Sequence, residues 1–257
     1  MRFADSHCHI LDPRLLIRAE EIVAHLDADD LDFIVEISAG AKESVDAVKF
    51  ADGHKNVYCT IGVHPHNLDE FTVGFEAWAK CRSNRKIVGY GECGLDYYHM
   101  PHLKDVQKEM FARQIKLAHE MKLPLVVHTR DAFDDTLAIL VANKDLVRNG
   151  LLIHCFSEGE AAVRRIREHF DPYFAFGGAV TYKGGKLDAA IRAVGLDRML
   201  LETDAPYLTP EPLRGTINEP KNVVFVAKYV AGVLDTSVDN VAKHTLANTR
   251  ALYRIYK

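Results

Sequence analysis

Two histidines, His7 and His9, lie one residue apart in the segment DSHCHILDP near the start of the chain. Alternate side chains of a β-strand point to the same face, so both imidazoles would face one point while Cys8 points away. The preceding residues are apolar and the segment becomes polar at Asp5, as in a buried strand that reaches an accessible opening. This spacing is typical of metal sites, although two hydrogen-bonded surface histidines would give the same pattern.

Four further ionisable residues, Glu92, His128, His154 and Asp204, occur at or just after the ends of apolar runs of strand length. Taken singly, each has an ordinary explanation as a hydrogen-bonded acid, a core histidine or a turn aspartate. Together with the histidine pair they would place six ionisable side chains at one end of the strands, where each unpaired buried group costs about 1 to 3 kcal/mol. Four imidazoles and two carboxylates exceed the usual ligand set of one zinc ion. The residues therefore predict a site for two divalent cations.

The elements that must position these residues alternate regularly along the chain. Eight apolar runs of strand length begin near residues 2, 31, 56, 86, 124, 151, 173 and 198. They are apolar on both faces, which is typical of parallel strands covered by helices. Eight βα units in 257 residues predict an α/β fold, a single-domain (β/α)₈ TIM barrel over residues 1–257 with the metal site at the C-terminal face of the strands. A doubly wound open sheet is the alternative.

Helical periodicity covers the segments between the strands, including residues 102–122 and 131–143. Two last helices are expected near residues 220–234 and 237–255. The segment 204–220 contains four prolines and predicts an ordered loop at the rim of the barrel. No linker rich in Gly, Ser or Pro divides the chain, which favours one domain.

The composition limits the classes of partner. Lys and Arg number 32 against 36 Asp and Glu, a formal net charge of −4, so contact with a polyanion must be local. The N-terminus lacks the apolar stretch of a secretion signal and no run has the length of a membrane span, so we expect a cytoplasmic protein without membrane contact or an obligate protein partner. Five cysteines without CxxC spacing fit reduced thiols, and strand alternation directs Cys8, Cys93 and Cys155 away from the predicted site.

Several segments together resemble the TatD family of metal-dependent deoxyribonucleases, a branch of the amidohydrolase-like barrels. They span nearly the whole chain, and the glutamate of the fourth strand and the ETDAPYLTP block are the most discriminating. The segments are DSHCHILD, GVHPH, GECGLDYY, PLVVHTRDAFDDTLAIL, HCFS, FAFGGAVTYK and LLETDAPYLTPEPLRGTINEP. The resemblance implies a divalent-metal-dependent hydrolase acting as an exonuclease on DNA ends or single strands.

The resemblance also implies the ligands of two divalent ions, which Glu92 would bridge. The implied ligands are His7, His9, Glu92, His128, His154 and Asp204. Because they are imidazoles and carboxylates, Mg²⁺, Mn²⁺ and Zn²⁺ all remain possible. Two such ions activate water and neutralise a leaving oxygen, and Asp204 is our candidate for the general base that takes the proton of that water.

Four residues outside the ligand set are expected to contact the substrate or a ligand. His64 follows the third strand and is counted with Asp204 and Glu92 among the catalytic residues, because we expect it to contact the scissile phosphate or the leaving group. A hydrogen bond that supports a metal ligand is the alternative. Arg130 and Lys183 lie directly after strands and are expected to bind substrate phosphates, although surface salt bridges explain them equally. Glu202 is close to Asp204 and is expected to support a metal ligand or to bind the metal itself.

Two other functions remain open beside the nuclease. The same binuclear centre would suit hydrolysis of a small ester, amide or lactone, or of an ester on tRNA. A catalytically silent, metal-stabilised binding protein is the alternative from another class. Tyr97 and Tyr98 could stack a splayed base, which favours single strands, whereas packing is their commoner use. His66 is predicted to be a loop histidine.

Overall fold

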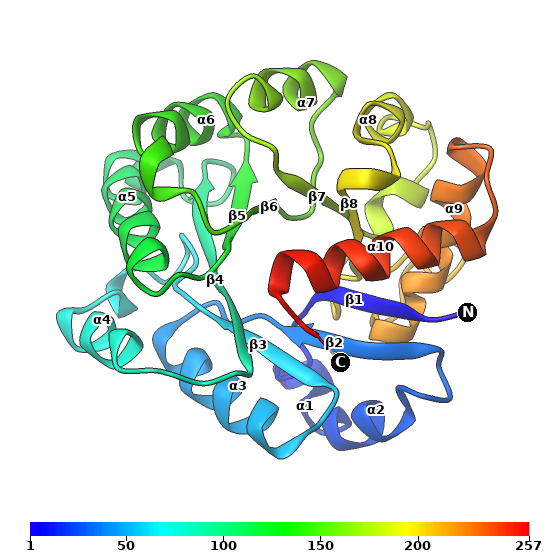
Figure 1. The fold of residues 1–257 in the computed structure, drawn as a ribbon, viewed down its shortest axis with the longest axis horizontal. Coiled ribbons are helices and arrows are strands. Elements are labelled where there is room, and N and C mark those ends of the chain that lie inside the picture. The colour runs from blue at the N-terminus through cyan, green and yellow to red at the C-terminus, as the bar shows by residue number, and fades with distance from the viewer. Residues whose placement is uncertain (257) are drawn as a thin grey trace.

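The computed structural model describes residues 1–256, and these form a barrel of eight parallel strands in sequence order (Figure 1). Each strand pairs with the next one along the chain. The strands are β1 (Phe3–Cys8), β2 (Leu31–Glu36), β3 (Val57–Ile61), β4 (Ile87–Asp96), β5 (Leu125–Arg130), β6 (Leu151–Ile153), β7 (Tyr173–Phe176) and β8 (Met199–Leu201). The predicted TIM barrel is therefore confirmed, and the open sheet is excluded.

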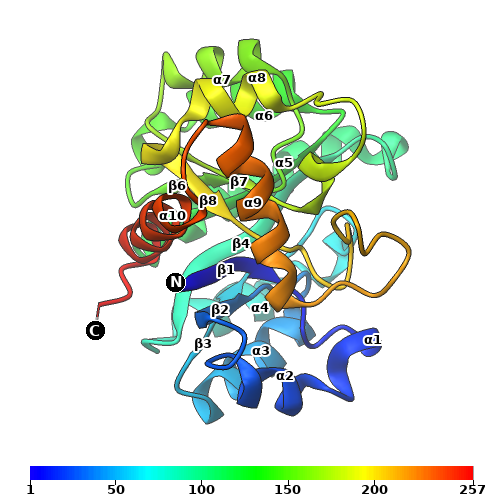
Figure 2. The same cartoon turned by 90° about the vertical axis from the view of Figure 1, so that its right-hand side faces the viewer.

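Helices cover the outside of the barrel (Figures 1 and 2). The α-helices are α1 (Pro13–Leu16), α2 (Ala19–His25), α3 (Ala41–Gly53), α4 (Val73–Lys80), α5 (Lys104–Glu120), α6 (Phe133–Ala142), α7 (Glu160–Arg167), α8 (Asp188–Val194), α9 (Val223–Val233) and α10 (Val238–Tyr253). Short 3₁₀ segments are η1 (Leu68–Glu70), η2 (Pro101–Leu103), η3 (Lys144–Leu146), η4 (Gly178–Thr181), η5 (Leu196–Arg198) and η6 (Pro220–Asn222). No helix among residues 1–256 has the length and apolar character to cross a membrane.

The barrel closes where β1 meets the segment that follows β8. The Asp204 amide donates to the His7 carbonyl over 2.9 Å, and the His9 amide donates to the Ala205 carbonyl over 2.7 Å. These bonds lie beyond the end of β8, so the closing seam runs through residues that the sequence assigns to the metal site. Figure 2 shows the loop that continues from Asp204 projecting at the end opposite α10.

Strand four is longer than the sequence indicates. Glu92 was expected to end it, but β4 continues to Asp96 because it stays paired with β5, with Gly94 beside His128 and Asp96 beside Arg130. Glu92 consequently lies in the middle of β4 rather than at its end. Asp96, the last residue of the strand, lies at the rim of the barrel.

The interior of the barrel is apolar at the end covered by α10. Leu252, Tyr253 and Ile255, at and after the end of that helix, pack against strand residues such as Phe33 and Leu200. Figure 1 looks at this end, with α10 in front of the strands. A larger apolar core lies between the sheet and the surrounding helices. Burial of these side chains, at about 25 cal/mol per Å² of apolar surface, is the main stabilising contribution.

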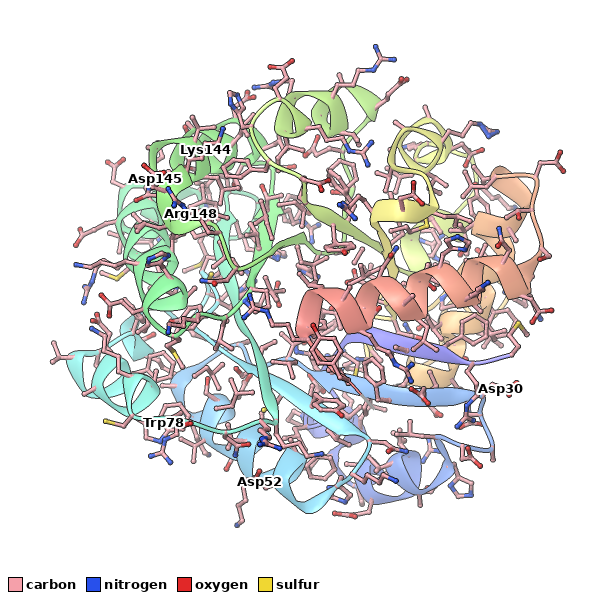
Figure 3. All side chains as sticks on the ribbon, viewed as in Figure 1. Asp30, Asp52, Trp78, Lys144, Asp145 and Arg148 are labelled. Atoms are coloured by element: carbon pink, nitrogen blue, oxygen red, sulfur yellow. The ribbon has the colours of Figure 1, made fainter. Side chains whose placement is uncertain are left out.

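Charged side chains are spread over the outer surface (Figure 3). Asp145 and Arg148, for example, form an exposed ion pair next to η3. Such exposed pairs contribute about 0 to 1 kcal/mol each to stability. The ionic contacts that matter for chemistry are the buried ones at the opposite end from α10.

Candidate metal centre

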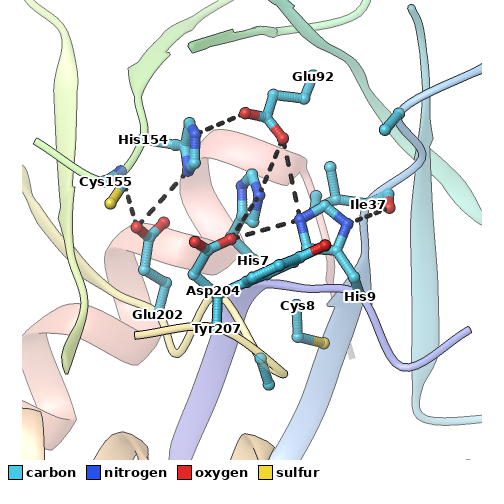
Figure 4. A network of polar contacts seen from close by, with 12 residues as sticks. His7, Cys8, His9, Ile37, Glu92, His154, Cys155, Glu202, Asp204 and Tyr207 are labelled. Carbon is cyan, nitrogen blue, oxygen red and sulfur yellow. Dashed lines mark hydrogen bonds and ion pairs between the residues drawn. The ribbon is translucent and has the colours of Figure 1, made fainter. Parts of the chain in front are cut away.

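Glu92, in β4, is the centre of a group of four histidines. Its Oε1 lies 2.7 Å from His128 Nδ1 and 2.7 Å from His154 Nε2. Its Oε2 lies 3.4 Å from His7 Nε2 and 3.9 Å from His9 Nε2. The two oxygens of one buried carboxylate therefore face two different pairs of imidazoles. Figure 4 shows Glu92 between His154 on one side and His7 and His9 on the other.

Asp204 completes the side of the site that His7 and His9 form. Its Oδ1 lies 3.4 Å from His9 Nε2 and 3.7 Å from His7 Nε2. His9 Nδ1 lies 2.9 Å from the Ile37 carbonyl, and donation to this oxygen orients the ring so that Nε2 faces Asp204. Asp204 has a φ of 55°, a left-handed conformation that aspartate tolerates better than most residues.

Two buried carboxylates hold the ligand-bearing strands in place. Asp5 accepts from the Thr203 amide over 2.9 Å and from the Thr203 hydroxyl, which ties β1 to the segment after β8. Glu202 is fully buried, accepts from the Cys155 amide over 2.7 Å and lies 3.6 Å from His154 Nδ1. Glu202 therefore sits behind His154 and fixes the peptide that follows it (Figure 4).

Proton binding shows how strongly this group of residues needs positive charge. Burial disfavours a charged imidazole, but the hydrogen bond to Asp204 and the charges of Asp204 and Glu92 together outweigh it and raise the pKa of His9 to about 9. Glu92 and Glu202 likewise outweigh burial and raise the pKa of His154 well above its usual value. Burial would raise the pKa of Glu92, yet the charge of His154 holds that pKa well below its usual value. Protons on the imidazoles thus neutralise carboxylates that a cation would otherwise neutralise.

Several buried polar atoms of this site have no hydrogen-bond partner within residues 1–256. They are His7 Nδ1, His7 Nε2, His128 Nε2, His154 Nδ1 and Glu202 Oε2. Orphaned buried groups are rare in folded proteins and call for a ligand or an ion. Because the available donors are imidazole nitrogens and carboxylate oxygens, the residues present fit divalent cations.

The structure brings all six predicted ligands together on the side of the barrel toward which the C-terminal ends of the strands point, with Glu92 and His128 inside their strands. One set of donor atoms within 4.8 Å of one another comes from His7, His9 and Asp204. A second comes from His64, Glu92 and His128, and a third from His7, His154 and Glu202. The first and third sets share His7, and Glu92 connects them to the second, since its Oε1 faces His128 and His154 and its Oε2 faces His7 and His9.

His64 joins the second set in position but differs in its protonation. Burial lowers the pKa of His64 well below its usual value, so the ring is neutral. Its Nδ1 accepts from the His66 amide over 3.1 Å, which places the ring hydrogen on Nε2. Nε2 lies 3.6 Å from Glu92 Oε1. In this tautomer His64 presents a hydrogen-bond donor to the site rather than a free electron pair.

The two expected phosphate-binding residues occupy different surroundings. Arg130 is exposed at the end of β5, with its guanidinium 4.3 Å from the centre of the exposed Tyr98 ring and no ion pair within residues 1–256. Lys183 lies in an exposed turn after η4, and the described residues give it no ion pair or side-chain hydrogen bond. Tyr97 is engaged elsewhere, since its hydroxyl contacts Asp135 over 2.6 Å.

A further cluster at the rim was not found by reasoning from the sequence. Asp96 Oδ2 lies 2.8 Å from His66 Nε2, 2.8 Å from His99 Nδ1 and 3.4 Å from His128 Nε2. His66 was expected to be a plain loop histidine, and Asp96 was not considered. The available signal was strand alternation, because Asp96 lies four residues beyond Glu92 on the same face of β4.

Comparisons with known proteins identify the family of this chain. Residues 4–254 match the family described as TatD related DNase. An uncharacterised metal-dependent hydrolase of Bacillus subtilis, YabD, is 35% identical over 98% of both chains. Another of Escherichia coli, YcfH, is 36% identical over 99% of this chain and 97% of its own. The crystal structure of YJJV, a TatD homologue from Escherichia coli, superposes with a TM-score of 0.91 at 26% identity and 99% coverage of both chains. The chain therefore belongs to the TatD family of metal-dependent hydrolases.

Proposed function

We propose that the protein is a deoxyribonuclease that holds two divalent cations and hydrolyses phosphodiester bonds at DNA ends or in single strands. The observation that carries this proposal is the position of Glu92, whose two oxygens face separate pairs of imidazoles. A carboxylate placed in this way is suited to bridge two cations, each of which would complete its ligand set from one side. Magnesium, manganese and zinc all suit these donors.

Cations bound there would polarise the phosphodiester, lower the pKa of the attacking water and neutralise charge on the leaving oxygen. Asp204 is the general base. Burial would raise its pKa, but the hydrogen bond to His9 and the charge of His7 hold the pKa below its usual value, so the carboxylate stays ionised at neutral pH. Its side chain keeps 14% of its surface exposed, so a proton taken from water can pass to solvent.

His64 acts on the substrate rather than as a ligand. Its neutral ring carries hydrogen on Nε2, which faces the same side of the site as Glu92 Oε1. This N–H can donate to an oxygen of the scissile phosphate or of the leaving group. Such a donor stabilises the charge that develops during cleavage, a contribution typically worth 10²- to 10³-fold in rate.

Nucleic acid is favoured as the substrate by the side chains around the opening. Tyr98 is 59% exposed and Tyr207 is 44% exposed, and the Tyr207 ring centre lies 6.0 Å from that of His9. Exposed aromatic rings stack unpaired bases at about 1 to 3 kcal/mol per base. Arg130 adds a cation without an ion pair in the described residues, which suits a phosphate. A slightly acidic chain with this local cationic contact suits DNA ends better than long duplex.

The cysteines support the cytoplasmic location expected from the sequence. All five are free, and Cys8, Cys59 and Cys93 are buried. Reduced thiols of this kind are typical of proteins from reducing compartments. We therefore place the proposed nuclease in the cytoplasm.

The proposal is tested by incubating the purified protein with a short 3′-labelled single strand, a matched duplex and a panel of ester, amide and lactone substrates. Mg²⁺, Mn²⁺ and Zn²⁺ are added in turn, and a chelator is the control. We expect stepwise shortening of the single strand that stops with chelator and returns with metal. Turnover of an ester without DNA cleavage under any ion would favour the small-substrate hydrolase, and no turnover at all would favour the silent binding protein.

The variant Asp204→Asn separates the two proposed roles of Asp204, general base and metal ligand. We expect DNA cleavage to fall by about 10²- to 10⁴-fold, the usual contribution of a general base. Metal content is measured on the same sample. An activity loss of only a few fold with full metal content would contradict the base assignment.

A further inference from the structure

His66, Asp96 and His99 form a second group of donors, here called the rim cluster, outside the six-residue centre. Asp96 Oδ2 lies 2.8 Å from His66 Nε2 and 2.8 Å from His99 Nδ1, and all three donor atoms lie within 4.8 Å of one another. The three residues come from the loop after β3, the end of β4 and the turn that follows β4. The fold therefore brings two separate loops to one carboxylate.

Asp96 is a buried residue held by several hydrogen bonds, unlike an acid on the surface. It is 1% exposed, and its Oδ1 accepts from the Tyr98 amide over 3.0 Å and from the His99 amide over 2.8 Å. The side chain of Gln107 fixes its backbone on both sides, accepting from the Asp96 amide over 2.7 Å and donating to its carbonyl over 3.0 Å. Oδ2 is left facing the imidazoles, and a buried carboxylate oxygen in this position requires a cationic or donor partner.

A second observation points in the same direction. His128 Nε2 is buried, has no hydrogen-bond partner within residues 1–256 and lies 3.4 Å from Asp96 Oδ2. Three imidazoles thus surround one carboxylate oxygen, and one of them has a ring nitrogen without a partner. The rim cluster therefore lies directly beside His128, a predicted ligand of the central site.

We propose that the rim cluster binds a third divalent cation, with His66 Nε2, Asp96 Oδ2 and His99 Nδ1 as its ligands. Two imidazoles, one carboxylate and an open position are the ligand set of many zinc sites that keep a place for a substrate. In a tetrahedral site with bonds of about 2.0 to 2.1 Å, neighbouring donors lie roughly 3.3 Å apart. The contacts of 2.8 Å must open by about half an ångström, which the half-exposed rings of His66 and His99 permit.

The position of this ion suggests a use, which rests on the proposed nuclease function. Tyr98 follows Asp96 by two residues, and its ring packs against Arg130. An ion in the rim cluster would lie on the same side of the opening as this pair. It would bind the phosphate next to the scissile one, while Tyr98 stacks the base of the same nucleotide.

The experiment measures ions per chain rather than activity. Protein freed of metal by chelation is loaded with micromolar Zn²⁺, washed and analysed by mass spectrometry of zinc and sulfur. The wild type is compared with the double variant His66→Ala, His99→Ala and with His102→Ala, an exposed histidine of η2 that serves as the matched control. We expect the double variant to lose one ion per chain and the control to keep the wild-type number. Equal numbers in all three proteins would overturn the proposal.

Anomalous diffraction at the zinc edge from wild-type crystals keeps the test valid if the double variant does not fold. We expect a peak between His66, Asp96 and His99, and an empty rim cluster in zinc-loaded crystals would overturn the proposal. Glu92→Gln separates the two sites, because it should lose the central ions and keep the rim peak. Failure of the proposed nuclease would leave the rim peak in place, so the two failures are distinguishable.

Discussion

The two ends of this barrel are built from the same strands but serve opposite purposes. At the end covered by α10, strand residues pack against Leu252 and Tyr253 in an apolar layer. At the other end the strands deliver histidines and carboxylates, and several buried polar atoms have no partner among residues 1–256. β1 contributes to both, with Ala4 in the apolar layer and His7 in the metal centre. The common direction of the strands therefore places the stabilising apolar layer at one end of the barrel and the metal centre at the other.

Glu92→Gln should give the largest effect at the polar end. The substitution keeps the shape of the side chain and removes the charge that both pairs of imidazoles face. We expect metal content to fall sharply and hydrolysis to fall by about 10³-fold or more, since cations at such a site contribute several kcal/mol. Elemental analysis and turnover of labelled DNA measure the two losses, and circular dichroism checks the fold. Wild-type metal content in this variant would contradict the bridging role.

Leu252→Ala tests the apolar end. Leu252 is 4% exposed and packs in the layer that closes the barrel. We expect the free energy of unfolding to fall by about 2 to 5 kcal/mol, the usual cost of this truncation in a core. Urea denaturation measures the loss, and kcat is determined on the folded fraction. If kcat fell along with stability, the two ends would not be independent.

Glu202→Gln tests a buried residue that lies between the apolar core and the metal centre. Glu202 is as buried as the apolar layer, yet it faces His154 and fixes the Cys155 amide. We expect metal affinity or activity to fall by about 10- to 100-fold while the fold is kept. Glu160→Gln, which alters an exposed ion pair of α7 with Arg164, is the control. Unchanged metal affinity together with unchanged activity would assign Glu202 to packing.

The last expected effect needs no substitution and is a dependence of metal binding on pH. The pKa of His9 is raised to about 9 in the metal-free protein, so at pH 7 its Nε2 carries a proton that must leave before it can bind a cation. Apparent Mn²⁺ affinity should therefore rise between pH 7 and 9 by at least about tenfold per pH unit, because His154, whose pKa is also raised, must release a proton as well. Calorimetry in two buffers of different ionisation enthalpy measures the released proton. An affinity that is flat over this range would remove His9 from the ligand set.

Much of the architecture could be predicted from the sequence because the physical signals are local. Alternation of apolar runs and helical segments indicated the barrel, and parallel strand ends brought His7, Glu92 and Asp204 to one opening. The predicted end of β4 was wrong, because its continued pairing with β5 depends on the neighbouring strand and not on the composition of the run. The position of Asp96 at the rim follows from that pairing.

Other features depend on loop conformation, which periodicity does not describe. The tautomer of His64 is set by the His66 amide, a contact within the loop after β3. The rim cluster requires that loop and the turn after β4 to meet at one oxygen. The apolar residues at the end of α10 are visible in the sequence, but the packing of Tyr253 against the strands is a tertiary contact that single-sequence patterns do not contain.

The closing seam has a consequence for the protein during its synthesis on the ribosome. Asp5 and Thr203, which hold the seam together, are 198 positions apart in the chain. During synthesis the first histidines leave the ribosome long before their partners after β8 exist. A nascent or prematurely terminated polypeptide that ends before β8 therefore lacks Asp204 and the closing seam, and it cannot complete the metal centre.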